Sequence, residues 1–164
     1  MSVAQFIQDA WNKQAKWLIV LRPLSWLYRG GFLLNKNLYK TGLKQSYTAP
    51  VPVMVIGNIT VGGSGKTPLL IHLVKYLQNH KIRLGVISRG YGGKGPFPAY
   101  VDLDAEAHVV GDEPMLIVQS TGVPMAVGSN RQKSIELLLS KHALDLIICD
   151  DGLQHWALER QLEW

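Results

Sequence analysis

A glycine-rich stretch between two apolar segments carries the clearest chemical signal in the sequence. The run Gly62-Gly63-Ser64-Gly65-Lys66-Thr67 follows the apolar residues 53–56 and precedes residues 69–77, where the apolar spacing is helical. A strand, a glycine loop and a helix that opens at Gly-Lys-Thr are the context of a phosphate-binding loop. Backbone N–H groups and the helix dipole then face phosphate oxygens, and the threonine hydroxyl can ligate Mg²⁺. The sequence therefore predicts binding of a nucleoside triphosphate.

The loop departs from the strict pattern at one position. Thr60 stands where the pattern has glycine, five residues before Gly65. A β-branched residue resists left-handed backbone conformations, so we expect a different loop entry, with Gly62 and Gly63 supplying the freedom to turn. The predicted nucleotide-binding residues are Thr60, Val61, Gly62, Gly63, Ser64, Gly65, Lys66 and Thr67.

A second apolar segment that predicts a strand is followed by two carboxylates. The apolar run 144–149 leads into Asp150-Asp151 and then Gly-Leu-Gln-His155. A strand that ends in Asp downstream of a phosphate loop is the usual partner of that loop and places a carboxylate beside the metal. His155 could orient a catalytic carboxylate or complete a turn, and the residues alone do not decide between these roles.

Two further carboxylates, Asp112 and Glu113, stand at the predicted start of a helix over 115–120. Adjacent acids at this place suit an N-cap, and they equally suit Mg²⁺ binding or proton abstraction from an attacking hydroxyl. Arg89 follows the predicted strand 84–88, where ligands bind in open parallel sheets. It is therefore a candidate anion contact, although a surface arginine in a turn explains the same pattern.

The positive charge of the chain is concentrated near its N-terminus. The 164 residues have a formal net charge of +5, and residues 1–49 hold seven basic side chains and one acid, so the remainder totals −1. Polar residues interrupt any early apolar core, which argues against a signal peptide, and no apolar run reaches the roughly 20 residues of a membrane span. A single cysteine, Cys149, indicates a reducing compartment without a disulfide framework.

Residues 1–49 read as an amphipathic helical arm. One helix is predicted over 3–21 and a second over 26–39, with Gly30-Gly31 as a weak point. Tryptophans among basic residues suit a helix in the interface of an anionic membrane, and packing on the domain core would explain the same faces. A nucleic-acid-binding arm fits less well, because the intervening residues are too apolar.

Residues 50–164 read as a phosphate-loop nucleotide-binding domain. Strands are predicted at 53–56, 84–88, 124–128 and 144–150, with short edge strands at Tyr100–Val101 and His108–Val110. A helix is predicted over 130–142. Strands that alternate with helices indicate an α/β fold with a mostly parallel sheet and flanking helices, preceded by the helical arm. The sheet is expected to be incomplete at the C-terminus, since the chain ends inside a further strand.

Four motifs in sequence order make the chain similar to a known family. They are Gly57-Asn-Ile-Thr-Val-Gly-Gly-Ser-Gly-Lys-Thr-Pro68, Ser88-Arg-Gly-Tyr-Gly-Gly93, Gly111-Asp-Glu-Pro114 and Asp150-Asp-Gly-Leu-Gln-His155. Together they resemble the tetraacyldisaccharide 4′-kinases, the lipid A 4′-kinases of Gram-negative bacteria. The resemblance covers most of the chain, and Thr60 fits the loop pattern of that family.

The resemblance implies an activity and a set of roles. It implies transfer of the ATP γ-phosphate to the 4′-hydroxyl of an acylated glucosamine disaccharide 1-phosphate, at the cytoplasmic face of the inner membrane. Asp112, Asp151 and Lys66 become the candidate catalytic residues, and Thr67, Glu113 and Asp150 the candidate Mg²⁺ ligands. The arm becomes a candidate membrane-docking element, because the acceptor does not leave the bilayer.

The chain departs from the family in its length, since family members are roughly twice as long, beyond the usual size of one domain. The other half would complete the sheet and supply a histidine that the family pairs with the Asp112 carboxylate. Two other functions therefore stay open: a membrane-recruited ATPase switch and an inactive, membrane-associating fragment. A lipid-independent ATPase rate would favour the first, and absence of nucleotide binding would favour the second.

Overall fold

The computed structural model describes residues 16–57, 65–153 and 155–164 of the chain, with the side chains of 16–18 left out. These residues belong to two compact units, Met1–Gln45 and Ser46–Trp164. We refer to the first unit as the arm and to the second as the sheet unit, and each is described by itself.

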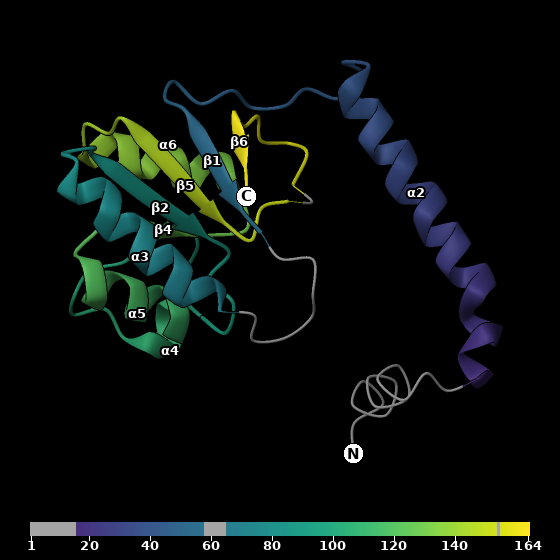
Figure 1. Ribbon diagram of the computed structural model, residues 1–164, viewed down its shortest axis with the longest axis horizontal. Coiled ribbons are helices and arrows are strands. Elements are labelled where there is room, and N and C mark those ends of the chain that lie inside the picture. The colour runs from purple at the N-terminus through teal and green to yellow at the C-terminus, as the bar shows by residue number, and fades with distance from the viewer. Residues whose placement is uncertain (1–15, 58–64, 154) are drawn as a thin grey trace. The chain divides into compact units, whose positions relative to one another are not determined.

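The described part of the arm is helical from Lys16 to Lys40. A 3₁₀ turn, η1 (Lys16–Leu21), leads into the long helix α2 (Arg22–Lys40), which has Pro23 in its first turn, where a missing N–H costs no hydrogen bond. The predicted weak point at Gly30-Gly31 is wrong, because α2 runs through both glycines without a break (Figure 1). Most of the predicted helix over 3–21 lies outside the described residues.

The length and composition of α2 also bear on membrane topology. Its 19 residues include several lysines and arginines among the apolar side chains. Within the described ranges, no helix combines the length and apolar character that a bilayer span requires.

The sheet unit is built on a six-stranded sheet in the order β3-β4-β2-β5-β1-β6. Its strands are β1 (Val53–Ile56), β2 (Leu84–Ser88), β3 (Ala99–Tyr100), β4 (Met125–Val127), β5 (Leu146–Asp150) and β6 (Leu162–Glu163). Each neighbouring pair is parallel except β3 with β4, which is antiparallel. The α/β fold with a mostly parallel sheet, flanking helices and a preceding helix is therefore confirmed.

Helices cover both faces of the sheet, which is the arrangement that parallel strands require (Figure 1). One face packs on α3 (Lys66–Asn79), α4 (Ala107–Val110) and α5 (Asp112–Thr121), and the other packs on α6 (Arg131–Lys141). Alternation along the strands divides the core, so that Ile56, Val86 and Ile148 face α3 and α5. Their neighbours Val55, Ile87 and Ile147 face α6.

Two sequence predictions near residue 110 need correction. His108–Val110 is not an edge strand but part of the short helix α4. The run is too short to show a period, and Val110 is buried in the same cluster as Met115 of α5. The helix predicted to start near Met115 begins at Asp112, and Gly111 is its N-cap residue. Asp112 is therefore inside the first turn and does not cap the helix.

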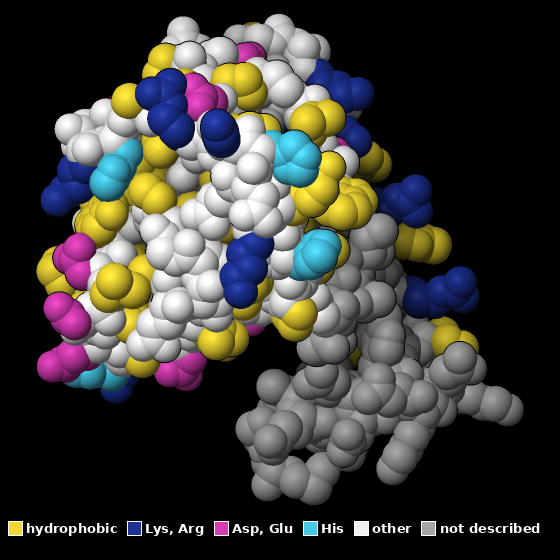
Figure 2. Space-filling model, turned by 60° about the vertical axis from the view of Figure 1, so that its left-hand side comes forward, with side chains coloured by type: hydrophobic (Ala, Val, Ile, Leu, Met, Phe, Trp, Pro, Cys, Tyr) yellow, Lys and Arg dark blue, Asp and Glu magenta, His cyan; other side chains and the backbone are white. Residues whose placement is uncertain are grey.

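The charges of the sheet unit are mixed. On the face that Figure 2 shows, acidic side chains gather at the lower left and also lie near the top, and lysines, arginines and histidines are spread over the rest. This distribution agrees with a unit whose net charge is close to zero, whereas the basic excess of the chain belongs to its first 49 residues.

Candidate nucleotide site

The predicted site residues gather at the carboxyl edge of the sheet. β1 leads toward the phosphate loop, β2 ends next to Arg89, and β5 ends in Asp150. In open parallel sheets, ligands bind outside this edge, where the strand order reverses. Thr60, Val61, Gly62, Gly63 and Ser64 were predicted to bind the nucleotide and lie outside the described residues.

Gly65 turns the chain into helix α3. Its φ of 75° lies in the left-handed region, which glycine reaches without a steric penalty. It is the N-cap residue of α3, and its carbonyl accepts a hydrogen bond of 3.2 Å from the Leu69 amide. The first turn of α3 contains no acidic side chain, so its free N–H groups and positive dipole end are available to an anion.

Lys66 and Asp151 form an ion pair across this edge. The lysine Nζ donates to the Asp151 Oδ1 at 3.1 Å, and the two side chains are 28% and 60% exposed. Water therefore reaches both groups, and such a pair adds little to stability. The pair instead holds a cation and a carboxylate together at the start of α3, where a phosphate would bind.

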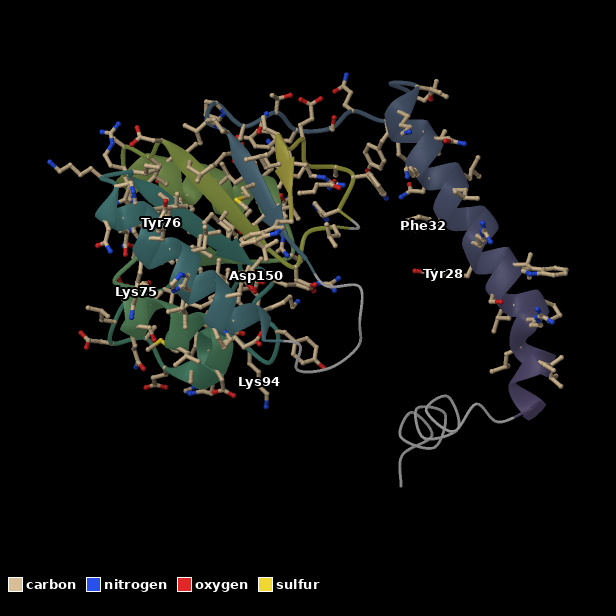
Figure 3. The ribbon with its side chains drawn as sticks, in the orientation of Figure 1. Tyr28, Phe32, Lys75, Tyr76, Lys94 and Asp150 are labelled. Carbon is tan, nitrogen blue, oxygen red and sulfur yellow. The ribbon has the colours of Figure 1, made fainter. Side chains whose placement is uncertain are left out.

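The two aspartates after β5 differ in environment. Asp150 is buried and lies at the end of the sheet (Figure 3). Burial raises the pKa of its carboxyl group, the positive charge of Lys66 opposes the rise, and the negative charges of Glu113 and Asp151 add to it. Asp151 has a φ of 56° and donates its amide to the Ile56 carbonyl at 2.9 Å. A hydrogen bond to β1 thus anchors a turn whose backbone is unusual for a non-glycine residue.

Glu113 connects helix α5 to helix α3. The Thr67 hydroxyl donates to the Glu113 Oε1 at 3.1 Å, so that the first turns of both helices meet. Gly111 permits this approach, because its φ of 103° is closed to other residues. Asp112 is exposed in the same turn, and no hydrogen bond or ion pair involves its carboxylate among the residues that the structure describes.

Arg89 and His155 lie close enough to interact electrostatically. Arg89 is exposed at the end of β2, and His155 is half-buried beside a cavity of about 360 Å³. Burial lowers the pKa of the His155 imidazole, and the positive charges of Arg131, Arg160 and Arg89 lower it further. His155 is therefore neutral at pH 7, so one of its ring nitrogens can accept a proton or a hydrogen bond.

Sequence reasoning missed two arginines that hold the segment after β5. Arg131 donates to the carbonyls of Gly128, Asp150 and Asp151, and Arg160 donates to those of Gly152, Leu153 and His155. Spacing could have revealed the first, because positions 131, 134, 135 and 138 share one buried helical face. An arginine on such a face needs buried partners.

The oxygen donors at this edge suit a small divalent cation. Thr67, Glu113 and Asp150 supply a hydroxyl and two carboxylates. Burial raises the pKa of Asp150, and the negative charges of Glu113 and Asp151, which add to the rise, are charges that a cation would offset. Mg²⁺ commonly takes one or two carboxylates together with substrate phosphates and waters, without a complete protein cage. In the ranges that the structure covers, no cluster of three or more His, Cys, Asp or Glu residues forms such a cage.

The order of the strands, the helix that opens at Gly65-Lys66-Thr67 and the Asp pair after β5 are the features of the P-loop nucleotide-binding fold. The family model for tetraacyldisaccharide-1-P 4′-kinase matches residues 17–164. The chain belongs to the tetraacyldisaccharide 4′-kinase family, which confirms the resemblance of its four motifs.

Individual relatives agree with the family match. The tetraacyldisaccharide 4′-kinase of Psychrobacter cryohalolentis is 55% identical over 166 aligned positions, which cover 100% of this chain and 45% of the relative. That of Actinobacillus pleuropneumoniae serotype 5b is 54% identical over 157 positions, covering 95% and 48%. The chain thus spans about half the length of the curated relatives it matches.

A solved structure has the same fold. LpxK from Aquifex aeolicus, crystallised in complex with ATP, superposes with a TM-score of 0.76 at 32% sequence identity. The match covers 88% of this chain and 47% of that one. At this identity and TM-score, the two chains share the fold over the region that holds the candidate site.

Proposed function

We propose that the chain is the nucleotide-binding portion of an ATP-dependent kinase that phosphorylates the 4′-hydroxyl of tetraacyldisaccharide 1-phosphate. The observation that carries the proposal is the contact of Lys66 with Asp151 at the carboxyl edge of the sheet. It places the lysine of a phosphate-binding motif against the acid that follows the partner strand. Family membership and the ATP in the crystals of LpxK from Aquifex aeolicus support ATP as the donor.

The described residues suggest how the donor would be held. The first N–H groups of α3 and the Lys66 amine face the phosphates, while Asp151 moves from pairing with Lys66 to the reacting side of the phosphate. Because Asp112 is exposed in the neighbouring first turn of α5, it is available to an acceptor hydroxyl. We propose that it orients this hydroxyl or accepts its proton.

We propose Thr67, Glu113 and Asp150 as the residues that hold Mg²⁺. The bound ion would offset the charge of the phosphates during transfer. The chain itself supplies a threonine hydroxyl that is already oriented by Glu113 and a buried carboxylate at the end of β5. Arg89 and His155 lie at the same edge and are candidate contacts for the acceptor.

The arm is proposed to dock the protein on an anionic membrane, at the cytoplasmic face of the inner membrane. No residue of α2 is buried, and Leu24, Leu27 and Leu34 on one helical face are 64%, 74% and 64% exposed. Arg22, Arg29 and Lys36 recur every seven residues on another face. A helix with an apolar face and a basic face is the type that lies in a membrane interface.

The nucleotide proposal is tested by Lys66→Ala in a version of the protein as long as its relatives. We expect ATP binding to weaken strongly and phosphate transfer to stop, with the fold retained, because the Lys66 side chain is partly exposed. Lys75→Ala is the matched control, since Lys75 is exposed further along the same helix (Figure 3). Unchanged ATP binding in Lys66→Ala would refute the proposed nucleotide site.

Measuring ATP affinity with and without Mg²⁺ separates the metal from the phosphates. Thr67→Ala should lose only the part of the affinity that depends on Mg²⁺, and raised Mg²⁺ should restore some of it. Equal losses in both conditions would argue against Thr67 as a metal ligand.

A further inference from the structure

Arg131 occupies a position that electrostatics and solvation both oppose. It is the first residue of helix α6, where the helix dipole disfavours a positive charge, and it is only 4% exposed. The helix does not need it for capping, because the Asn130 side chain accepts the Lys133 amide at 3.1 Å. A buried cation at this place therefore calls for a role other than helix stability.

The guanidinium group connects the ends of two strands. Its Nη1 donates to the Gly128 carbonyl at 2.9 Å, just beyond β4, and its Nη2 donates to the Asp150 carbonyl at 3.2 Å. A longer bond of 3.4 Å reaches the Asp151 carbonyl. None of the ion pairs in the described part of the chain involves Arg131. Only a planar group with several donors reaches three carbonyls at once, and an ammonium group is a poor substitute.

These bonds act on the turn that carries the candidate catalytic acids. Asp151 has a φ of 56°, a backbone conformation that persists when the surroundings impose it. Its amide is held by the Ile56 carbonyl, its carbonyl by Arg131, and its carboxylate by Lys66. Of the three groups that make these contacts, only the Arg131 guanidinium also donates to the carbonyl of Asp150, so it fixes both acids relative to the sheet.

We propose that Arg131 is a positioning residue for phosphate transfer, which acts through the Asp150-Asp151 turn without touching the nucleotide. The inference rests on the proposed function of this site. The main competing explanation is a direct contact with an anionic substrate, since Arg131 also lines the cavity of about 360 Å³ beside His155. The two roles differ in which kinetic constant a substitution changes.

The first test uses Arg131→Met, which keeps an unbranched apolar stem at the buried position and removes all donors. We expect kcat to fall about 10- to 100-fold, with the KM values for ATP and acceptor changed less than about threefold. Arg131→Lys should lose less, and it covers the case that Arg131→Met does not fold. Lys133→Met, an exposed charge in the same helical turn, is the matched control and should leave kcat unchanged.

A double-mutant cycle shows whether Arg131 works through the acids. Asp151→Asn keeps a residue that tolerates the left-handed region but removes the carboxylate charge. If Arg131 acts through this turn, adding Arg131→Met to Asp151→Asn should lower kcat by less than about threefold more. Multiplicative losses in the double variant, or a raised acceptor KM with normal kcat in Arg131→Met, would overturn the proposal.

Hydrogen exchange tests the same inference without any reaction. The Asp151 amide bonds to Ile56, so its exchange should speed up at least tenfold in Arg131→Met and stay unchanged in Lys133→Met. Unchanged exchange of this amide would overturn the proposal. Since this readout needs neither ATP nor acceptor, it remains decisive even if the protein proves not to phosphorylate the disaccharide.

Discussion

Lys66 and Asp151 are 85 positions apart in the sequence and meet because β1 and β5 are paired in parallel register. Ile56 lies opposite Asp150, so the chain leaves both strands at the same edge. Of the charged groups that gather there, Glu113 and Asp151 are exposed, Lys66 is partly exposed, and burial raises the pKa of Asp150. Groups arranged in this way contribute more to binding and chemistry than to stability.

Asp112 gives the sharpest residue-scale prediction. If it orients the acceptor hydroxyl or takes its proton, Asp112→Asn in the longer protein should lower turnover by roughly two or more orders of magnitude. Melting temperature should barely change, because the side chain is exposed and the N-cap residue is Gly111. Turnover and melting should be measured on one preparation.

Asp104→Asn is the control for Asp112→Asn, since Asp104 is an exposed acid in the turn before α4. It should leave both turnover and melting temperature at the wild-type values. An Asp112→Asn variant with near-normal turnover would refute a catalytic role for Asp112.

At the scale of single residues, the sequence analysis identified the functional candidates that belong to a recognisable motif. Lys66, Thr67, Glu113, Asp150 and Asp151 were all named from spacing and family resemblance, and the structure brings them to one edge. Their roles remain predictions. Arg131 and Arg160 were missed because the bonds that hold the segment after β5 go to backbone carbonyls, which leave no complementary residue in the sequence; Arg160 also pairs with the nearby Glu163.

Among the elements, the buried strands were the easiest to predict. β1, β2, β4 and β5 are largely apolar runs, of which β1, β4 and β5 are bounded by Gly, Pro or Asp, and all four lie within one or two residues of the predicted bounds. The short helix α4 was mistaken for a strand because tertiary packing decided its conformation. Local preference favours strand for two adjacent valines.

Helix α2 offers an element-scale prediction at Gly30-Gly31. Neither glycine has a positive φ, and an added Cβ at either would meet nothing within 4 Å. Each Gly→Ala change should therefore favour the helix by about 1 kcal/mol. Circular dichroism of a peptide of residues 16–45 on anionic vesicles should show more helix in the double alanine variant.

Gly42→Ala in the same peptide is the control for the two helix glycines. Gly42 has a φ of 74°, so alanine there is strained and should not increase the helix content. A loss of helix or of vesicle binding in the Gly30-Gly31 variant would mean that the pair serves as a hinge.

For the whole molecule, the separation of charge between its two parts matters most. The first 49 residues carry +6 and the remainder −1, although the chain as a whole is only moderately basic. Electrostatic attraction to an anionic surface would therefore act on the arm, while the sheet unit, whose net charge is close to zero, would be attracted very little.

We predict that the full-length protein binds anionic vesicles through the arm. Each basic side chain near such a surface contributes on the order of 1 kcal/mol, so Arg22→Gln or Arg29→Gln should lower binding about fivefold. Raised salt should weaken it as well. Replacing Trp11, Trp17 and Trp26 with Ala should reduce vesicle binding further without unfolding the sheet unit. Of these side chains, that of Trp26 is 71% exposed.

Co-sedimentation at low and high salt, together with melting curves, measures these effects. Lys75→Gln removes an exposed charge from the sheet unit and should leave vesicle binding unchanged. If the tryptophans belonged to a packed core, each replacement would cost about 3–5 kcal/mol of stability instead. Lost stability with unchanged vesicle binding would make the arm a structural element.

The strand order β3-β4-β2-β5-β1-β6 also determines when neighbouring strands can pair during synthesis of the chain. Among the strands that the structure describes, β1 is the first to leave the ribosome, yet its neighbours β5 and β6 follow only after β2, β3 and β4. At roughly 5–20 residues per second, β5 follows the end of the arm by on the order of ten seconds. An arm that binds lipid would thus be attached to the membrane before Lys66 and Asp151 can meet, so the phosphate site would be assembled at the bilayer surface.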